Sequence, residues 1–197
     1  MLLVNPWPQK SAGPVPDSVV AISTPRMAAT RRSVRDRVIV RAMSDSVSVQ
    51  RTIAASADGL WKMVSDVTRM GSWSPETTGC EWKGTPAEAV VGARFKGKNQ
   101  KGWRRWSTVC TVTESRPGEV FGFDVNAGPF AIAHWKYRFA PSGDGCTVTE
   151  TWTDRRGGPM KVLGKIVSGV GDRATHNRET MEATLQQLAS AAESANA

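Results

Sequence analysis

The chain has 197 residues, of which 40% are hydrophobic and 22% charged, and a formal net charge of +8 at pH 7. This length and composition are those of one globular domain with a sizeable core. The three cysteines show no C-x-x-C spacing and there are only two histidines. We therefore expect no disulfide framework, no metal site and no cofactor, and a reduced, cytoplasmic setting. No window holds the eighteen or so uninterrupted apolar residues of a membrane span.

The first 42 residues differ in composition from the rest. They hold five prolines and a charge excess of +5, from seven Lys or Arg against two Asp, which leaves +3 for residues 43–197. Such a segment buries too little apolar surface to order itself, so we predict a disordered extension at 1–42 and a folded domain at 43–197. Two alternatives stay open for the extension: an Arg-rich transit peptide, or a translation start at Met43.

The pattern becomes regular from Ser46. Residues 46–53 alternate between apolar and polar side chains, as in a half-buried strand, and a helical region capped by Ser56 follows. Turn residues then separate six strand-like runs at hairpin distances, which predicts an antiparallel meander. The six runs are 78–84, 93–99, 103–115, 119–126, 131–142 and 146–154.

The C-terminal segment carries apolar residues at spacings of three and four, or their multiples, with charge on the other side. This pattern predicts one long amphipathic helix over 158–194, with a bend near Gly169 or Gly171.

Several motifs in this order resemble one family. They are IAASADGLWKMVSD at 53–66, WSP at 73–75, VGARFKG at 91–97, TVTESRPGEVFGFDV at 111–125, WKYRF at 135–139 and TVTETW at 147–152. With the order of elements, they resemble the START-like superfamily, and within it the bacterial polyketide cyclase/dehydrase and lipid-transport (SRPBCC) group. The resemblance implies an α+β helix-grip fold, in which a curved antiparallel sheet wraps around a long C-terminal helix and leaves a cavity. These motifs are structural, so they indicate a fold more strongly than a reaction.

Residues 96–114 combine five cations and two tryptophans with an alternating run. Clustered cations and aromatics suit a nucleic-acid surface. The folded part carries only +3, however, which argues against nucleic acid as a partner. If Val112 faces the helix, as the resemblance implies, then Arg104, Trp106 and Cys110 point the same way. The run then forms a hairpin and a strand of the cavity wall.

The same period of two places other side chains on the inner face. Such a wall, apolar and aromatic with a few polar groups, is typical of a small-molecule pocket, and simple core packing is the alternative. The expected ligand-binding residues are Trp106, Cys110, Phe121, Phe123, Trp135, Tyr137 and Trp152 on strands, with Leu163 and Val167 on the last helix.

Glu150 is the one carboxylate among the inward positions. Burial would raise its pKa and suit it to general acid or base catalysis. The alternatives are an outward side chain or a pairing with Arg104. His134, next to the inward Trp135, is expected to face outward.

Two functions follow from this reading of the sequence. The first is binding of a small hydrophobic, lipid- or polyketide-like ligand, with or without cyclase or dehydratase activity. The second is that of a non-catalytic toxin-like or regulatory protein of the same fold, which binds a partner. The sequence contains neither a nucleotide-binding motif nor a nucleophile motif that would identify the protein as an enzyme.

Overall fold

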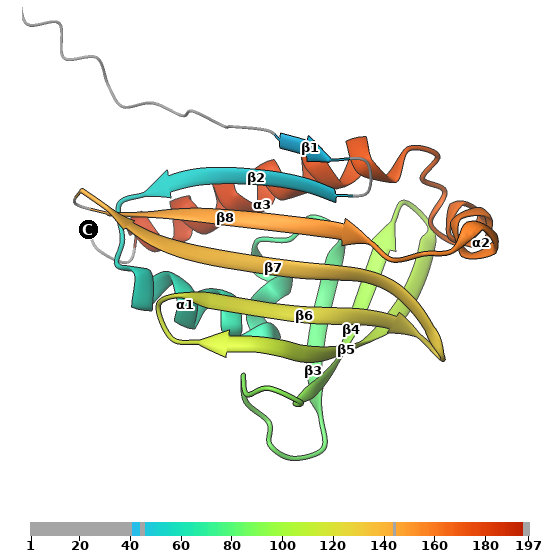
Figure 1. Cartoon of the computed structure of the whole chain (residues 1–197), viewed down its shortest axis with the longest axis horizontal. Helices are drawn as coiled ribbons and strands as arrows, with labels where there is room; N and C mark the ends of the chain where they lie inside the picture. Colours follow the sequence, from blue (N-terminus) through green and yellow to red (C-terminus); the bar gives the residue numbers. More distant parts are fainter. Residues whose placement is uncertain (1–40, 44–45, 144, 195–197) are drawn as a thin grey trace, which may run out of the picture. The chain divides into compact units, whose positions relative to one another are not determined.

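The computed structural model describes residues 41–43, 46–143 and 145–194. Most of the predicted extension, residues 1–40, lies outside them, so its boundary stays a prediction. The elements in chain order are β1 (Arg41–Met43), β2 (Ser46–Ile53), α1 (Ala57–Ser65), the 3-10 helix η1 (Val67–Ser72), β3 (Thr77–Lys83), β4 (Arg94–Lys101), β5 (Arg104–Arg116), β6 (Val120–Ala127), β7 (Phe130–Ser142), β8 (Gly145–Asp154), α2 (Gly158–Ser168) and α3 (Arg173–Ser194) (Figure 1).

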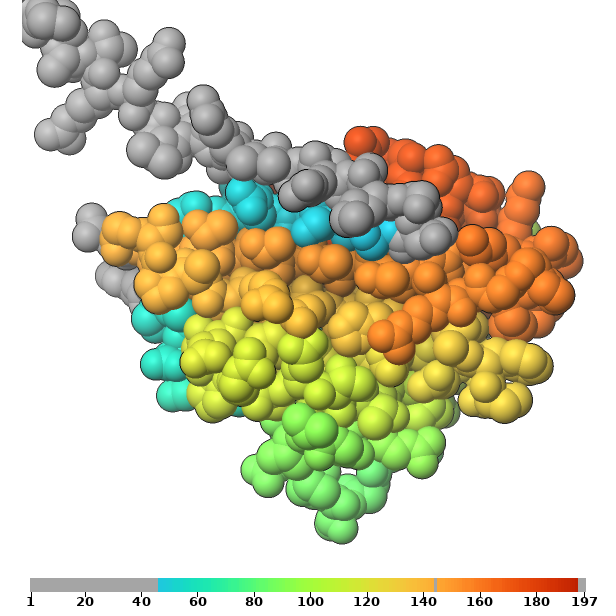
Figure 2. Space-filling view, in the orientation of Figure 1, coloured from blue at the N-terminus to red at the C-terminus, as the bar shows by residue number. Residues whose placement is uncertain are grey.

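The strands form one antiparallel sheet in the order β1-β2-β8-β7-β6-β5-β4-β3. All six strands predicted after the first helix are confirmed, with ends within two residues of those expected. Strands β3 to β8 form a meander because each pairs with the next one in sequence. Strand β2 pairs with β8, which places an early strand of the chain beside the last one. Figure 2 shows the outer face of the sheet, where β2, β8, β7 and β6 lie side by side.

Helix α3 covers the inner face of the sheet and packs against β2, β8 and α1. Its apolar stripe recurs at helical spacing and is buried, as expected for an amphipathic helix. The buried side chains of this stripe are Met181, Leu185, Leu188, Ala189 and Ala192. The arrangement is the predicted α+β helix-grip fold.

The C-terminal segment is two helices where we predicted one bent helix. Helix α2 ends because Gly169 adopts a left-handed conformation (φ +70°), which favours glycine. Asp172 then begins α3, since its Oδ1 accepts a hydrogen bond from the backbone N–H of Thr175 at 3.1 Å. As a result α3 runs along the sheet, whereas α2 lies across its end (Figure 1).

Gly145 marks a close approach between β8 and the end of β2. A Cβ atom at this position would collide with the backbone carbonyl of Ile53. Gly145→Ala should therefore lower the free energy of unfolding by about 1–3 kcal/mol, because the backbone has to shift. Gly79→Ala in β3 is the control, since its Cβ would meet nothing within 4 Å, and it should change stability by less than about 0.5 kcal/mol. Urea denaturation measures both; equal effects would contradict the prediction.

Candidate functional site

A cavity of about 260 Å³ lies between the inner face of the sheet and the two C-terminal helices. Strands β3 to β8 supply most of its wall, and η1, α2 and α3 complete it. Nine of the ten predicted site residues line it: Trp106, Cys110, Phe123, Trp135, Tyr137, Glu150, Trp152, Leu163 and Val167.

Rows of side chains across paired strands build the wall. Trp152 pairs with Trp135, which pairs with Phe123, and residues paired in this way share one face of a sheet. In the next row Glu150 pairs with Tyr137, and Tyr137 with Phe121. Phe121 is fully buried but does not line the cavity, because it packs in the core beside Phe123 with ring centroids 5.8 Å apart. The expectation that it contacts a ligand is not supported.

Glu150 points inward and is only 2% exposed. The hydroxyl of Tyr137 donates a hydrogen bond to its Oε1 at 2.6 Å, and Oε2 has no partner among the described residues. Neither alternative for Glu150 holds, since it is not outward and Arg104 stacks instead on the Trp103 ring, 4.5 Å from the ring centroid.

The electrostatics of this pair follow from its burial. Loss of solvation raises the pKa of Glu150 to about 8, against the opposing effect of the Tyr137 hydrogen bond. Burial, and then the nearby carboxyl, also raises the pKa of Tyr137 well above its usual value. At neutral pH the carboxyl is therefore mostly protonated. Because Oε1 accepts from Tyr137 and Oε2 has no partner among the described residues, a proton carried on Oε2 would make that oxygen a hydrogen-bond donor.

The cysteines near the cavity are not suited to nucleophilic chemistry. Burial raises the pKa of Cys110 to about 12 and that of Cys80 to about 11, so both thiols stay protonated at neutral pH. Within the described ranges, no group of three His, Cys, Asp or Glu side chains could hold a metal ion.

A second polar group of the wall was missed by sequence reasoning. Arg173, at the start of α3, donates from Nη1 and Nη2 to the two carboxylate oxygens of Glu76, both at 2.9 Å. His176 Nε2 lies 3.3 Å from Glu76 Oε1, and burial is the main cause that lowers the pKa of His176. The ion pair ties α3 to the segment before β3. Its partners are 97 positions apart and belong to no motif, so the sequence held no signal for it.

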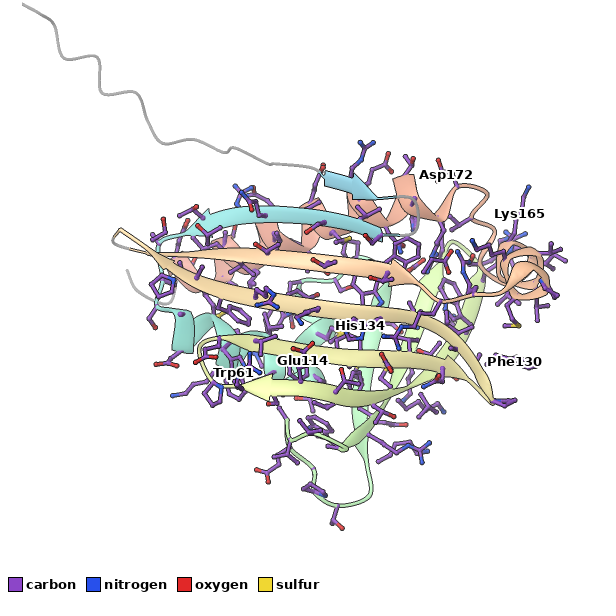
Figure 3. All side chains as sticks on the ribbon, viewed as in Figure 1. Trp61, Glu114, Phe130, His134, Lys165 and Asp172 are labelled. Carbon is purple, nitrogen blue, oxygen red and sulfur yellow. The ribbon has the colours of Figure 1, made fainter. Side chains whose placement is uncertain are left out.

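The outer face of the sheet carries a separate set of polar contacts. His134 lies there as predicted, with Nδ1 2.7 Å from Asp124 Oδ1. Lys136 donates to both oxygens of Glu114, at 2.6 and 2.8 Å. Figure 3 labels His134 and Glu114 on this face. Neither residue reaches the cavity.

Comparison with known proteins agrees with this architecture. The family described as polyketide cyclase / dehydrase and lipid transport matches residues 44–193, so the chain belongs to that family, as its motifs predicted. Comparison with curated proteins finds no match.

Solved structures with the same fold have little sequence identity to this chain. Protein CV1439 from Chromobacterium violaceum is 16% identical, with a TM-score of 0.59 over 77% of this chain and 99% of that one. Protein TTHA0849 from Thermus thermophilus is 18% identical, with a TM-score of 0.58 over 77% and 99%. Major latex-like protein 151 from Panax ginseng is 11% identical, with a TM-score of 0.59 over 75% and 96%.

Membership of this family implies a cavity for a hydrophobic ligand, which is the kind of cavity the inner face forms. Of the helices in the described part of the chain, none is long and apolar enough to cross a membrane.

Titration of Glu150 should make stability depend on pH. Its pKa is about 8 in the folded protein and near 4.5 without the fold, so between these values the native state binds more protons than the unfolded state. The free energy of unfolding should then fall as pH rises from 4.5 to 8, with a slope of at most about 1.4 kcal/mol per pH unit from this group. Glu150→Gln should remove this part of the slope in urea titrations from pH 4.5 to 8.5. Glu119→Gln, at an exposed site, should keep it; an unchanged slope in Glu150→Gln would refute the assignment.

The Glu76–Arg173 pair should matter more for stability than a surface pair. Its side chains are 15% and 19% exposed. Glu76→Gln leaves the Arg173 guanidinium half-buried without its counter-charge, so we expect a loss of about 1–3 kcal/mol in the free energy of unfolding. In the exposed pair Arg116–Glu119, Glu119→Gln should cost less than about 0.5 kcal/mol. Similar losses in the two variants, measured by chemical denaturation, would contradict this ranking.

Proposed function

We propose that this protein binds a small, mostly apolar molecule that carries one uncharged hydrogen-bond acceptor, such as a ketone. The observation that carries the proposal is a cavity with aromatic walls and a single buried acid whose Oε2 has no partner among the described residues. The cavity volume of about 260 Å³ is near the lower end of ligand pockets, which begin at about 300 Å³. A small ligand suits it better than a long-chain lipid.

The polarity of the wall supports a neutral ligand. Phe95, Trp106, Phe123, Trp135 and Trp152 supply ring faces and edges, which favour flat or aliphatic groups. The Glu76 carboxylate and the Arg173 guanidinium already satisfy each other. Glu150 is buried and, when protonated, offers a donor at Oε2, which has no partner among the described residues. A carbonyl oxygen is a group that would accept from it.

Binding can be tested with N-phenyl-1-naphthylamine, an uncharged probe whose fluorescence rises in apolar sites. Thr180 lines the cavity and Glu179, its neighbour on α3, is exposed. Thr180→Phe should fill the cavity and weaken probe binding at least about tenfold, whereas Glu179→Phe should leave it within about twofold. Equal binding by the two variants would place the probe elsewhere and overturn the proposal. Native mass spectrometry of the purified protein shows in addition whether a ligand or a protein partner accompanies it.

The role of Glu150 is tested by competition between two naphthalenes of similar shape. We expect 2-acetylnaphthalene, which has a carbonyl, to displace the probe better than 2-isopropenylnaphthalene, which has none. Glu150→Leu should abolish this preference because the donor is lost, and Glu150→Gln should keep most of it because its amide still donates. If the wild type shows no preference, Glu150 does not recognise an acceptor, even if the cavity binds the probe.

Catalysis is the second candidate, and the same proton supports it. A protonated carboxyl with a pKa of about 8 is suited to transfer a proton to a carbonyl, as cyclisation of a polyketone requires. Gln donates a hydrogen bond but releases no proton. Glu150→Gln should therefore keep ligand affinity and lower turnover about 10²- to 10⁴-fold, followed as loss of water from a synthetic triketone by mass spectrometry. A wild-type protein that binds the triketone without converting it would be a carrier.

A further inference from the structure

Helix α2 exposes the apolar face that a surface helix normally buries. Val162 is 63% exposed, Leu163 49%, Ile166 67% and Val167 42%. Their spacing places all four on one side of the helix. Scattered single apolar residues are normal on a protein surface, but a contiguous patch usually marks an interaction site.

Two hairpin tips at the same end of the sheet carry further exposed aromatic rings. Trp103, between β4 and β5, is 81% exposed, and Phe130, at the start of β7, is 54% exposed. These hairpins and α2 lie at the same end of the sheet, where Figure 3 labels Phe130 and Lys165. The Arg104 guanidinium lies against Gly169, since a Cβ there would be 2.9 Å from its Nη1, so the β4–β5 hairpin contacts the end of α2.

Positive charge is concentrated at this end of the domain. The segments that meet there, 74–77, 99–106, 127–132 and 153–176, hold eight Lys or Arg and three Asp or Glu. The rest of residues 43–197 holds eleven Lys or Arg and thirteen Asp or Glu. The excess of +3 on the domain therefore comes wholly from the end that carries the apolar patch.

The patch also borders the cavity. Leu163 and Val167 line the cavity and are at the same time half exposed. Helix α2 thus has one apolar surface that reaches from the ligand site to the outside of the molecule.

We propose that the α2 surface, formed by Trp103, Phe130, Val162, Leu163, Ile166 and Val167 with the basic residues around it, docks onto the surface of an anionic lipid bilayer. Aliphatic and aromatic side chains enter the boundary between headgroups and acyl chains, while Lys and Arg attract anionic headgroups. Tryptophan in particular favours this interface. Docking would place the cavity next to the membrane, where apolar molecules dissolve.

Other occupants fit the α2 surface less well. A second copy of the chain, docked through the same surface, would bring two positive ends together, which costs free energy. A nucleic acid would neutralise the cations but would leave the aliphatic side chains of α2 uncovered. A bilayer satisfies both the charge and the apolar area.

The test is co-sedimentation of the full chain with two kinds of vesicle. One kind is made of phosphatidylcholine alone, and the other of phosphatidylcholine with 30% phosphatidylglycerol. The double variant Val162→Gln/Ile166→Gln changes exposed residues that do not line the cavity, so it should keep N-phenyl-1-naphthylamine binding. We expect its partition onto the phosphatidylglycerol vesicles to fall at least about tenfold, and Lys165→Glu to lower partition several-fold at low salt. Val91, which is 64% exposed, and Lys83 lie at the β3–β4 connection, the end of these two strands away from the β4–β5 hairpin. Val91→Gln/Lys83→Glu is the matched control and should have little effect.

The outcomes separate docking from its alternatives. All variants keep the same basic residues 1–42, so a loss in the α2 double variant alone reports on the α2 surface. Equal partition of the wild type and this variant, or no partition of either, would overturn the proposal. Two further results would also overturn it. One is a wild-type dimer that the double variant does not form, which would identify a second copy of the chain as the occupant. The other is competition between a single-stranded oligonucleotide and the vesicles for the protein. Because cavity binding of the probe is measured separately, failure of docking leaves the proposed ligand binding intact.

Discussion

The packing of α3 against the inner face of the sheet is the constraint on which both the core and the cavity depend. In its C-terminal half α3 presents Leu185, Leu188 and Ala192, which are buried against β2, β8 and α1. Nearer its start α3 lines the cavity with Arg173, Thr180, Met181 and Thr184. One helix therefore contributes both to the solid core and to the wall of the cavity.

Two carboxyl groups of the cavity wall illustrate opposite solutions to burial. Glu76 has a cation as its partner, because the guanidinium of Arg173 donates hydrogen bonds to both of its oxygens. Glu150 has only the Tyr137 hydroxyl as a partner among the described residues, and it stays protonated at neutral pH because no cation there offsets its loss of solvation. One pair holds elements together, whereas the other leaves a proton available at the site.

Much of this architecture could be predicted from local patterns. Strand alternation and hairpin residues located β3 to β8, and the same alternation placed Glu150, Trp135 and Trp152 on the inner face. Alternation gives the face of a residue but not its depth, which is why Phe121 was expected in the cavity and lies in the core.

Other features depend on contacts between distant residues. The apolar spacing runs on through the break between α2 and α3, so it did not reveal that Gly169 and Asp172 separate two helices. The contact of Glu76 with Arg173 joins an irregular segment to a helix and exists only in the folded chain. The exposure of α2 was likewise hidden, since the sequence shows an amphipathic face but not whether another element covers it.

The wall of the cavity is assembled from single side chains of many elements, from Met70 in η1 to Thr184 in α3. The backbone hydrogen bonds of the sheet hold its strands in place, and none of these bonds is made by an inward side chain. A substitution in the wall therefore reshapes the space offered to a ligand while the ladder of strands persists. Such a scaffold is well suited to divergence, because descendants of one ancestor can acquire different specificities one residue at a time. In the end such descendants share the fold but have almost no sequence identity.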